Sequence, residues 1–314
     1  DGVRVDKSSL LVLGPTGSGK TALARAVADL LDVPIVIVEA TSLTQAGYVG
    51  DDVEVCVKRL LEAAHYDVAL AEQGIVVIDE IDKLARKTAP QSGARDVSGE
   101  GVQQALLRLL EQSRVTVKAT PATRRYLLPR AGEHFVVNTD DILFICTGAF
   151  PALPDIIQRR LDAGHGFGFA APTAPSASPA QSPSLSPSPS TRPQALSIPA
   201  TLPLPHVTTE DLIEYGFIRE FVGRFGIVAH TEELTRDELI AVLTEPKHAL
   251  VKQFERLFRS SGVQLLCHPA SFGAIADLAL TTAIGARGLR RIMHQVLQEA
   301  QFAYSDSDVA YAVI

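Results

Sequence analysis

The chain has 314 residues, 46% of them hydrophobic, and a formal net charge of −7. This length and apolar content are sufficient for two domains with buried cores. The acidic balance, without a basic stripe, gives no electrostatic support for nucleic-acid binding. No apolar run reaches the roughly 18–20 residues of a membrane span. The three cysteines, Cys56, Cys146 and Cys267, lack C-x-x-C spacing, which favours a reducing compartment and argues against a zinc site.

The first feature along the chain is an apolar strand over Leu10–Leu13, then a glycine-rich turn and a helix over Lys20–Leu31. The turn fits the phosphate-binding pattern G-x-x-x-x-G-K-[ST] and reads Gly14-Pro15-Thr16-Gly17-Ser18-Gly19-Lys20-Thr21. Its glycines let backbone N–H groups point at an anion, next to a helix N-terminus that favours negative charge. We predict that Lys20 contacts the β- and γ-phosphates of ATP and that Thr21 offers its hydroxyl to Mg²⁺.

The next elements are predicted to be a strand over 33–40, a helix from 51 or 52 to 73, and an apolar strand over 74–80. This last strand ends in Asp79 and Glu80, which places both carboxylates at the ligand-binding edge of a parallel sheet. Asp79 is predicted to hold the Mg²⁺ shell, and Glu80 to orient the attacking water. Together with the phosphate loop, this pair predicts ATP hydrolysis rather than binding alone.

The remaining elements predict an α/β domain followed by a small α+β domain. They are a helix over 99–112, hairpin arms at 115–117 and 135–137, a strand over 142–146, helices over 210–215, 237–243, 247–259, 270–282 and 289–304, and short strands over 263–267 and 309–314. Residues 170–206 are rich in Pro, Ser and Ala, which excludes regular structure and predicts a disordered or polyproline-like insertion. We place the domains at 1–231 and 232–314. Because the chain opens on Asp1 rather than Met, we expect a fragment.

Two arginines lie beside glycines. Arg224 follows Gly223, and Arg287 lies between Ala286 and Gly288. A planar guanidinium suits the charge that spreads over phosphoryl oxygens during transfer. From the residues alone, each of these arginines is more often a surface residue than a catalytic one.

Several motifs occur in an order that resembles the ClpX family of AAA+ protein unfoldases, which feed the ClpP peptidase. They are GPTGSGKT, QAGYVG, GIVVIDEIDK, RDVSGEGVQQALL, ILFICTGAF, EFVGR and GARGLR. The resemblance covers essentially the whole chain except the insertion. It implies a P-loop AAA+ fold with parallel sheet and helices on both faces, ATP and Mg²⁺ as cofactors, protein substrates, a homohexamer and a ClpP-type peptidase partner.

The resemblance also implies roles for individual residues. Arg224 would be the finger that reaches a neighbouring subunit's site, and Arg287 a second sensor. Tyr48 and Val49 would line the axial pore, with Arg95 in a second pore loop. The peptidase-docking tripeptide corresponds to Phe167-Gly168-Phe169, and Thr147 replaces a family glycine, where its hydroxyl could sense the γ-phosphate.

A glycine-flanked aromatic ring such as that of Tyr48 can contact almost any polypeptide without requiring a particular sequence. Three alternatives stay open. An HslU-like unfoldase would need a large insertion where a single helix is predicted, and a DNA-acting AAA+ motor would need a basic face. A truncated, ATP-binding scaffold without unfolding activity is the third. The low-complexity insertion predicts a mitochondrial or plastid location in a eukaryote, with a bacterial cytoplasm as the alternative.

Overall fold

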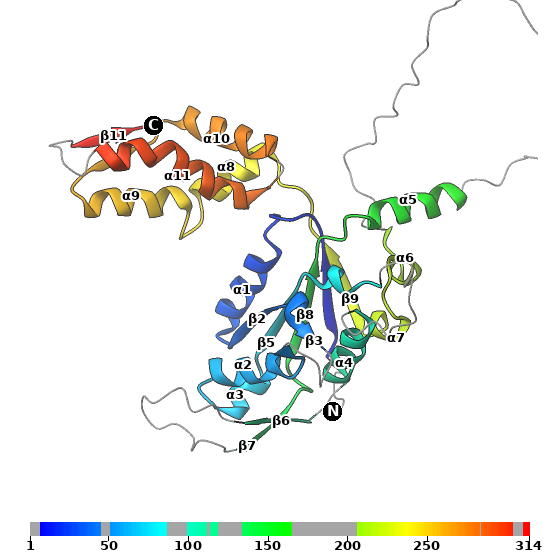
Figure 1. The fold of residues 1–314 in the computed structure, drawn as a ribbon. Helices are drawn as coiled ribbons and strands as arrows, with labels where there is room; N and C mark the ends of the chain where they lie inside the picture. The colour runs from blue at the N-terminus through cyan, green and yellow to red at the C-terminus, as the bar shows by residue number, and fades with distance from the viewer. Residues whose placement is uncertain are drawn as a thin grey trace, which may run out of the picture.

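The computed structural model describes residues 7–44, 51–86, 99–111, 114–118, 134–164, 206–282, 284–303 and 310–314. Their elements form two lobes that are joined by an extended segment after strand β9 (Figure 1). The predicted roles of Tyr48, Val49, Arg95 and Phe167–Phe169, and nearly all of the insertion, lie outside these residues.

The first lobe is built on a five-stranded parallel sheet in the order β2-β5-β8-β1-β9. The strands are β1 (Ser9–Leu13), β2 (Ile35–Glu39), β5 (Ile75–Asp79), β8 (Leu143–Gly148) and β9 (Phe225–His230). Because all five run in the same direction, their carboxyl ends meet at one edge. The phosphate loop after β1, the acids that end β5 and Thr147 near the end of β8 are therefore neighbours.

Alternating strand residues pack against different helices, as the pleat of a strand requires. On one face, Val12 and Val77 are buried with Ala24 of α1 (Lys20–Leu31). On the other face, Leu11 and Ile78 belong to a larger core that also includes residues of α2 (Val55–Ala63) and α4 (Glu100–Leu110). The sheet thus has helices on both faces, which confirms the predicted α/β class.

The prediction of a single helix from 51 or 52 to 73 is wrong, because two helices occupy this stretch. Asp51–Asp52 form strand β4, which pairs with β3 (Leu43–Thr44), and α2 is followed by α3 (Val68–Glu72). His65 and Tyr66 adopt positive φ angles of 55° and 64°, a left-handed conformation that ends α2. Asp67 then caps α3 by accepting a hydrogen bond from Leu70 N at 3.2 Å.

Strands β6 (Arg114–Lys118) and β7 (His134–Asn138) pair antiparallel, as the predicted hairpin arms require. The elements that were not predicted include β9 and helix α5 (Leu153–Gly164). Short helices α6 (Thr209–Tyr215) and α7 (Arg219–Val222) follow. Two 3₁₀ turns, η1 (Ala40–Ser42) and η2 (Ile81–Leu84), complete this lobe.

The second lobe has its own hydrophobic core, which includes Leu239, Phe258, Ile275 and Met293. Its elements are α8 (Arg236–Thr244), α9 (Leu250–Ser260), β10 (Gln264–Leu266), α10 (Pro269–Thr281), α11 (Ala286–Ala303) and β11 (Tyr311–Val313). Strands β10 and β11 pair in parallel. Over the described ranges, none of the helices combines the length and apolar character needed to cross a bilayer.

Candidate functional site

The turn after β1 adopts a conformation that only glycine tolerates at two positions. Gly14 and Gly17 have φ angles of 144° and 85°. A Cβ atom on Gly14 would overlap Thr231, and one on Gly17 would overlap the carbonyl of Ile284. Glycine is therefore required at both positions, by the backbone conformation and by the close packing of the loop against neighbouring segments. Helix α1 begins directly after the loop at Lys20.

The Lys20 ammonium lies inside this loop. Its Nζ donates to the carbonyl oxygens of Gly14 at 2.6 Å and Pro15 at 2.7 Å. Burial lowers the pKa of Lys20 below its ordinary value; the carboxylate of Asp79 opposes this effect and the guanidinium of Arg287 adds to it. The burial that comes with this position in the loop thus weakens the hold of Lys20 on its proton.

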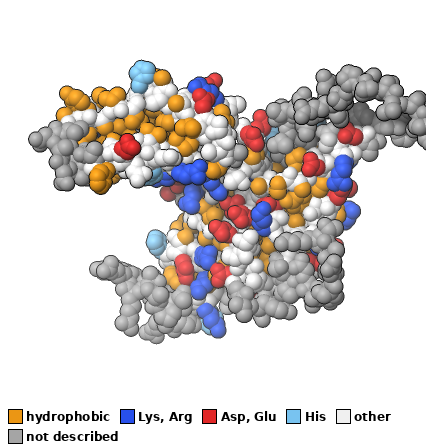
Figure 2. All heavy atoms as spheres, turned by 45° about the horizontal axis from the view of Figure 1, so that its top comes forward, with side chains coloured by type: hydrophobic (Ala, Val, Ile, Leu, Met, Phe, Trp, Pro, Cys, Tyr) orange, Lys and Arg blue, Asp and Glu red, His pale blue; other side chains and the backbone are white. Residues whose placement is uncertain are grey.

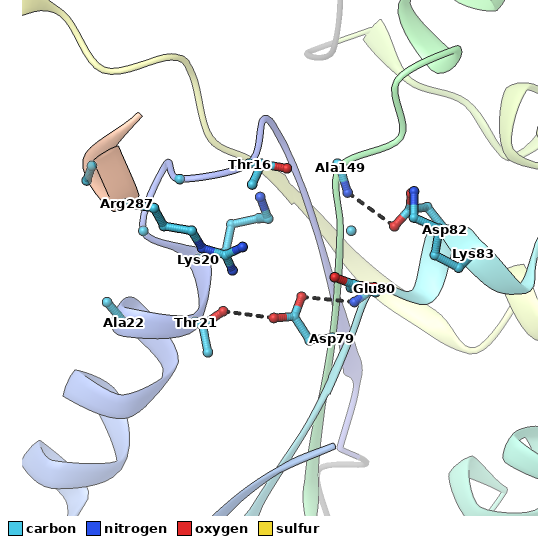
Figure 3. Close-up of a pocket in the computed structure, with 14 residues that line it drawn as sticks. Thr16, Lys20, Thr21, Ala22, Asp79, Glu80, Asp82, Lys83, Ala149 and Arg287 are labelled. Atoms are coloured by element: carbon cyan, nitrogen blue, oxygen red, sulfur yellow. Dashed lines mark hydrogen bonds and ion pairs between the residues drawn. The ribbon is translucent and has the colours of Figure 1, made fainter. Parts of the chain in front are cut away.

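Asp79 is the centre of a hydrogen-bonded group of side chains at the end of β5. Its Oδ2 accepts from the Thr21 hydroxyl at 3.1 Å (Figure 3). Its Oδ1 accepts from the Thr147 hydroxyl at 2.6 Å. Thr147 is fully buried, so its hydroxyl serves Asp79 and does not open into the cavity. These two bonds fix the rotamer of the carboxylate.

This donor set fits Mg²⁺. A carboxylate and a hydroxyl converge at hydrogen-bond distance, and hard oxygen donors of this kind suit that cation. Within the described residues no group of three or more His, Cys, Asp or Glu side chains could hold a metal alone. That agrees with the habit of Mg²⁺ to take one or two protein ligands and complete its shell with phosphates and water.

Glu80 adopts a left-handed conformation, with φ 58° and ψ 34°. Its backbone N donates to Asp79 Oδ1 at 2.9 Å, which holds the turn at the end of β5. A non-glycine residue in this region of φ and ψ is strained, and such strain is concentrated at functional sites. The turn places Glu80 on the wall of the same cavity as Asp79 and Lys20.

Arg287 reaches the site from the second lobe. It lies in the first turn of α11, so the helix begins three residues earlier than predicted. Figure 3 shows its side chain directed toward Lys20 across the mouth of the cavity. The cavity has a volume of about 360 Å³ and is lined by residues of both lobes. In Figure 2, basic and acidic side chains gather where the lobes meet.

Arg224 lies elsewhere, in the turn between α7 and β9, where its guanidinium forms an ion pair with Glu111 after the last turn of α4. The described residues that line the cavity with Lys20 and Glu80 do not include Arg224. The loop residues Pro15 and Ser18 line a second cavity, of about 400 Å³, which Phe150, Leu234 and Leu280 also line.

Asp82 is a site residue that sequence reasoning missed. It is buried, and its Oδ1 accepts from Ala149 N at 3.3 Å, while Lys83 Nζ lies 3.1 Å from its Oδ2. Asp82 thereby ties the turn after β5 to the turn after β8. The signal available in the sequence was a third acid two residues after Glu80.

Comparison with known proteins places this geometry in a family. Residues 5–228 match the family described as AAA domain (Cdc48 subfamily), and residues 234–302 match the C-terminal, D2-small domain, of ClpB protein. The ClpX ATP-binding subunit of the ATP-dependent Clp protease from Azotobacter vinelandii is 43% identical over 304 residues, covering 96% of this chain and 63% of its own length.

Two further relatives are similar to nearly the whole chain. The ClpX subunit of Porphyromonas gingivalis is 41% identical over 305 residues, covering 96% of this chain and 67% of its own. The mitochondrial ClpX-like chaperone of Saccharomyces cerevisiae is 40% identical over 325 residues, covering 99% of this chain and 62% of its own length. The chain spans about two thirds of the length of these relatives. It belongs to the ClpX family of AAA+ ATPases.

Proposed function

We propose that this chain hydrolyses ATP to unfold proteins, as a hexameric ring that passes them to a ClpP-type peptidase. The observation that carries the proposal is the convergence of Lys20, Asp79 and Glu80 from the first lobe and Arg287 from the second on one cavity. An ATPase site built from two lobes can convert nucleotide turnover into relative movement of those lobes.

Within this site each residue has a proposed role. Lys20 and the loop from Gly14 to Thr21 bind the phosphates of ATP, and Arg287 binds them from the second lobe. Thr21 and Asp79 hold Mg²⁺, which when bound neutralises charge on the phosphates. Glu80 orients the attacking water, and Thr147 keeps the Asp79 carboxylate in place. The second cavity, of about 400 Å³ and also lined by loop residues, would receive the nucleoside.

The domain bounds and the role of Arg224 are also proposals. Residues 1–231 form the large ATPase domain and 232–314 the small domain, in agreement with their separate hydrophobic cores. Arg224 acts in a neighbouring subunit. Its position outside the cavity of its own chain supports this role, because a finger that acts in a neighbour must be displaced from its own site.

The roles of residues outside the described ranges follow from the family resemblance. Tyr48 and Val49, with Arg95 in a second loop, grip substrate in the pore, and Phe167-Gly168-Phe169 docks on the peptidase. Relatives of this chain are named ATP-binding subunits of the ATP-dependent Clp protease, which supports that partner. The insertion supports a mitochondrial compartment, which the yeast relative's name shares.

One experiment separates unfolding from the alternatives. The parent chain and Tyr48→Ala are assayed for ATP hydrolysis, melting temperature and loss of fluorescence from a tagged, folded reporter. We expect Tyr48→Ala to keep hydrolysis and lose unfolding, because the proposed pore role of Tyr48 requires no contact with phosphates or Mg²⁺. A folded reporter is stable by roughly 5–15 kcal/mol, so a slipping grip cannot open it.

Other results would contradict the proposal. Stimulation of the parent ATPase by DNA instead of unfolded protein would indicate a DNA-acting motor, and no turnover at all would indicate a scaffold. If Tyr48→Ala unfolds the reporter as well as the parent does, another residue grips the substrate. A joint fall in melting temperature and hydrolysis would make Tyr48 a packing residue.

A further inference from the structure

Thr231, the first residue after β9, joins the phosphate loop to the segment that connects the lobes. Its backbone N donates to Leu13 O at 2.8 Å, which continues the β1–β9 pairing to the beginning of the loop. Its hydroxyl oxygen lies 2.7 Å from the Ser18 hydroxyl oxygen and 3.3 Å from Leu13 O. No feature of the nucleotide motif itself predicts a partner at position 231.

The Thr231–Ser18 bond is present whichever hydroxyl donates. Each hydroxyl has one proton, and Ser18 also lies 2.9 Å from the carbonyl oxygen of Pro15. Either Thr231 donates to Ser18 and Ser18 to Pro15, or Ser18 donates to Thr231 and Thr231 to Leu13. In both arrangements the loop and the connecting segment share a hydrogen bond between part-buried side chains.

The loop is in close contact with the second lobe's chain on its other side as well. The Gly17 carbonyl accepts from Ala286 N, at the start of α11, at 3.2 Å. A Cβ on Gly14 would overlap Thr231, and one on Gly17 would overlap Ile284. There is no spare space at either contact, so the loop cannot move without displacing one of these segments.

We propose that Thr231 is a positioning residue whose hydroxyl couples the phosphate loop to the connecting segment. The inference rests on the proposed function, because it requires phosphates to bind at the loop. Lys20 Nζ lies 3.5 Å from Ser18 Oγ and is bonded to the Gly14 and Pro15 carbonyls. Turning Lys20 toward phosphate oxygens removes a donor from Ser18 Oγ and from the Pro15 carbonyl that Ser18 contacts, and that change reaches Thr231 through the Ser18–Thr231 bond.

Linkage makes the coupling reciprocal. A ligand that prefers one arrangement of the loop shifts the connecting segment, and an altered segment changes the affinity of the loop by the same factor. The hydroxyl of Thr231 is therefore expected to influence both nucleotide affinity and the local opening of the chain after β9. A residue that only filled space would influence neither through its hydroxyl.

The test uses ADP as the probe and four chains: the parent, Thr231→Val, Thr231→Ser and Ser18→Ala. Hydrogen exchange is followed by mass spectrometry in the peptide covering 229–235, with and without ADP at a concentration that saturates each chain. In the parent and in Thr231→Ser we expect ADP to slow exchange by about two- to tenfold, the factor that corresponds to one net hydrogen bond. Thr231→Val, which keeps the shape and loses the hydroxyl, is expected to lose this slowing.

A second readout is the dissociation constant for ADP. Thr231→Val and Ser18→Ala are each expected to raise it by about two- to tenfold, and the double variant by no more than the larger single effect, because both remove one shared bond. If Thr231→Val fails to fold, the comparison of Ser18→Ala with the parent gives the same hydrogen-exchange test.

The outcomes distinguish the inference from the proposed function. A parent chain that binds ADP without slowed exchange, or a Thr231→Val chain that behaves as the parent does, overturns the coupling alone. Additive effects on the dissociation constant overturn the shared bond. A parent chain that binds no ADP overturns both the coupling and the proposed function.

Discussion

At the residue scale, the site separates two carboxylates that are adjacent in sequence. Asp79 has its two oxygens engaged by Thr21 and Thr147, whereas Glu80 is turned by a left-handed backbone onto the cavity wall. Asp79 is held by hydrogen bonds, as its proposed role at a metal requires, and Glu80 lies on the cavity wall, where we propose that it orients water. This difference arises from backbone geometry and hydrogen bonding, because the two side chains have nearly the same chemistry.

The first prediction concerns Glu80. In Glu80→Gln we expect nucleotide binding to be kept and turnover to fall by about 10²–10⁴-fold, the usual contribution of a positioned base. Lys20→Ala is the matched contrast, since it should weaken binding itself. Binding is measured with a fluorescent ATP analogue and turnover by phosphate release. Parental turnover in Glu80→Gln would show that another group orients the water.

The second prediction concerns Thr147. Thr147→Val removes the bond to Asp79 at nearly constant volume, so the carboxylate loses one of its two side-chain partners. We expect the Mg²⁺ concentration needed for half-maximal nucleotide binding to rise by about two- to tenfold. Thr147→Ser should restore the parental value. An unchanged Mg²⁺ requirement in Thr147→Val, measured by calorimetric titration, would mean that this bond does not position Asp79.

The third prediction is a pH dependence set by Lys20. Burial lowers the pKa of Lys20, so its ammonium loses its proton at a lower pH than an exposed lysine does. Nucleotide affinity should be full below that lowered pKa and fall as the pH rises through it. Lys20→Arg is the control, because a guanidinium stays charged across this range. If both chains lose affinity at the same pH, the titrating group is not Lys20.

At the element scale, the sequence was informative where apolar runs are continuous and buried. Strands β5 and β8 are recognisable for this reason, and α1 has the bounds that its pattern predicted. Strand β9 was missed because its residues do not form such a run. Gly226 interrupts it, and at the edge of the sheet Ile227 is 55% exposed.

The break between α2 and α3 depends on contacts that are distant in sequence. The ring of Tyr66 packs on Phe135, 69 positions later, with centroids 5.6 Å apart. No local pattern encodes that contact. The site shows the same division: Lys20, Thr21, Asp79 and Glu80 follow from motif and strand order, whereas the partners Asp82 and Thr231 are set by tertiary packing.

The fourth prediction concerns the ion pair between α5 and α6. Arg160 Nε donates to Asp211 Oδ1 at 2.8 Å, and Asp211, 1% exposed, also caps α6 with Thr208. Burial alone would raise the pKa of Asp211, but the bonds from Arg160 and Thr208 outweigh it and lower the pKa. The stabilisation is therefore present above the ordinary carboxyl pKa and is lost as the pH falls through the lowered one.

Asp211→Asn should lower the melting temperature at neutral pH by on the order of 5 °C. The difference from the parent should shrink as the pH falls toward the lowered pKa of Asp211. Asp162→Asn, in the same helix as Arg160 and exposed, serves as the control. A parent and an Asp211→Asn chain with parallel pH profiles would show that the carboxylate charge does not contribute.

At the scale of the whole molecule, the two lobes meet at the candidate nucleotide site, and each contributes charged side chains to it. The first lobe contributes both acids and Lys20, and the second contributes Arg287. Movement between the lobes therefore changes the site, and occupancy of the site changes the preferred arrangement of the lobes. Arg224 does not line this cavity in its own chain, so we propose that it acts on the nucleotide site of a neighbouring subunit.

The fifth prediction tests that action. Arg224→Ala should bind nucleotide as the parent does and turn it over about 10³–10⁵-fold more slowly, the range attributed to an arginine finger. Arg219→Ala removes a nearby exposed arginine of α7 and should leave turnover at the parental rate. Phosphate release is measured for each variant alone, and the assembly state by size exclusion with light scattering at increasing ATP concentrations.

Mixing variants distinguishes action on a neighbour from action within the chain. Arg224→Ala and Glu80→Gln chains are each expected to be nearly inactive alone. In a mixed ring, some interfaces pair an intact Glu80 from one chain with an intact Arg224 from the next, so part of the activity should return. Recovery should follow the fraction of such interfaces as the mixing ratio is varied. A mixture no more active than its components would place the function of Arg224 within its own subunit, and monomers at every ATP concentration would rule out the ring for this chain.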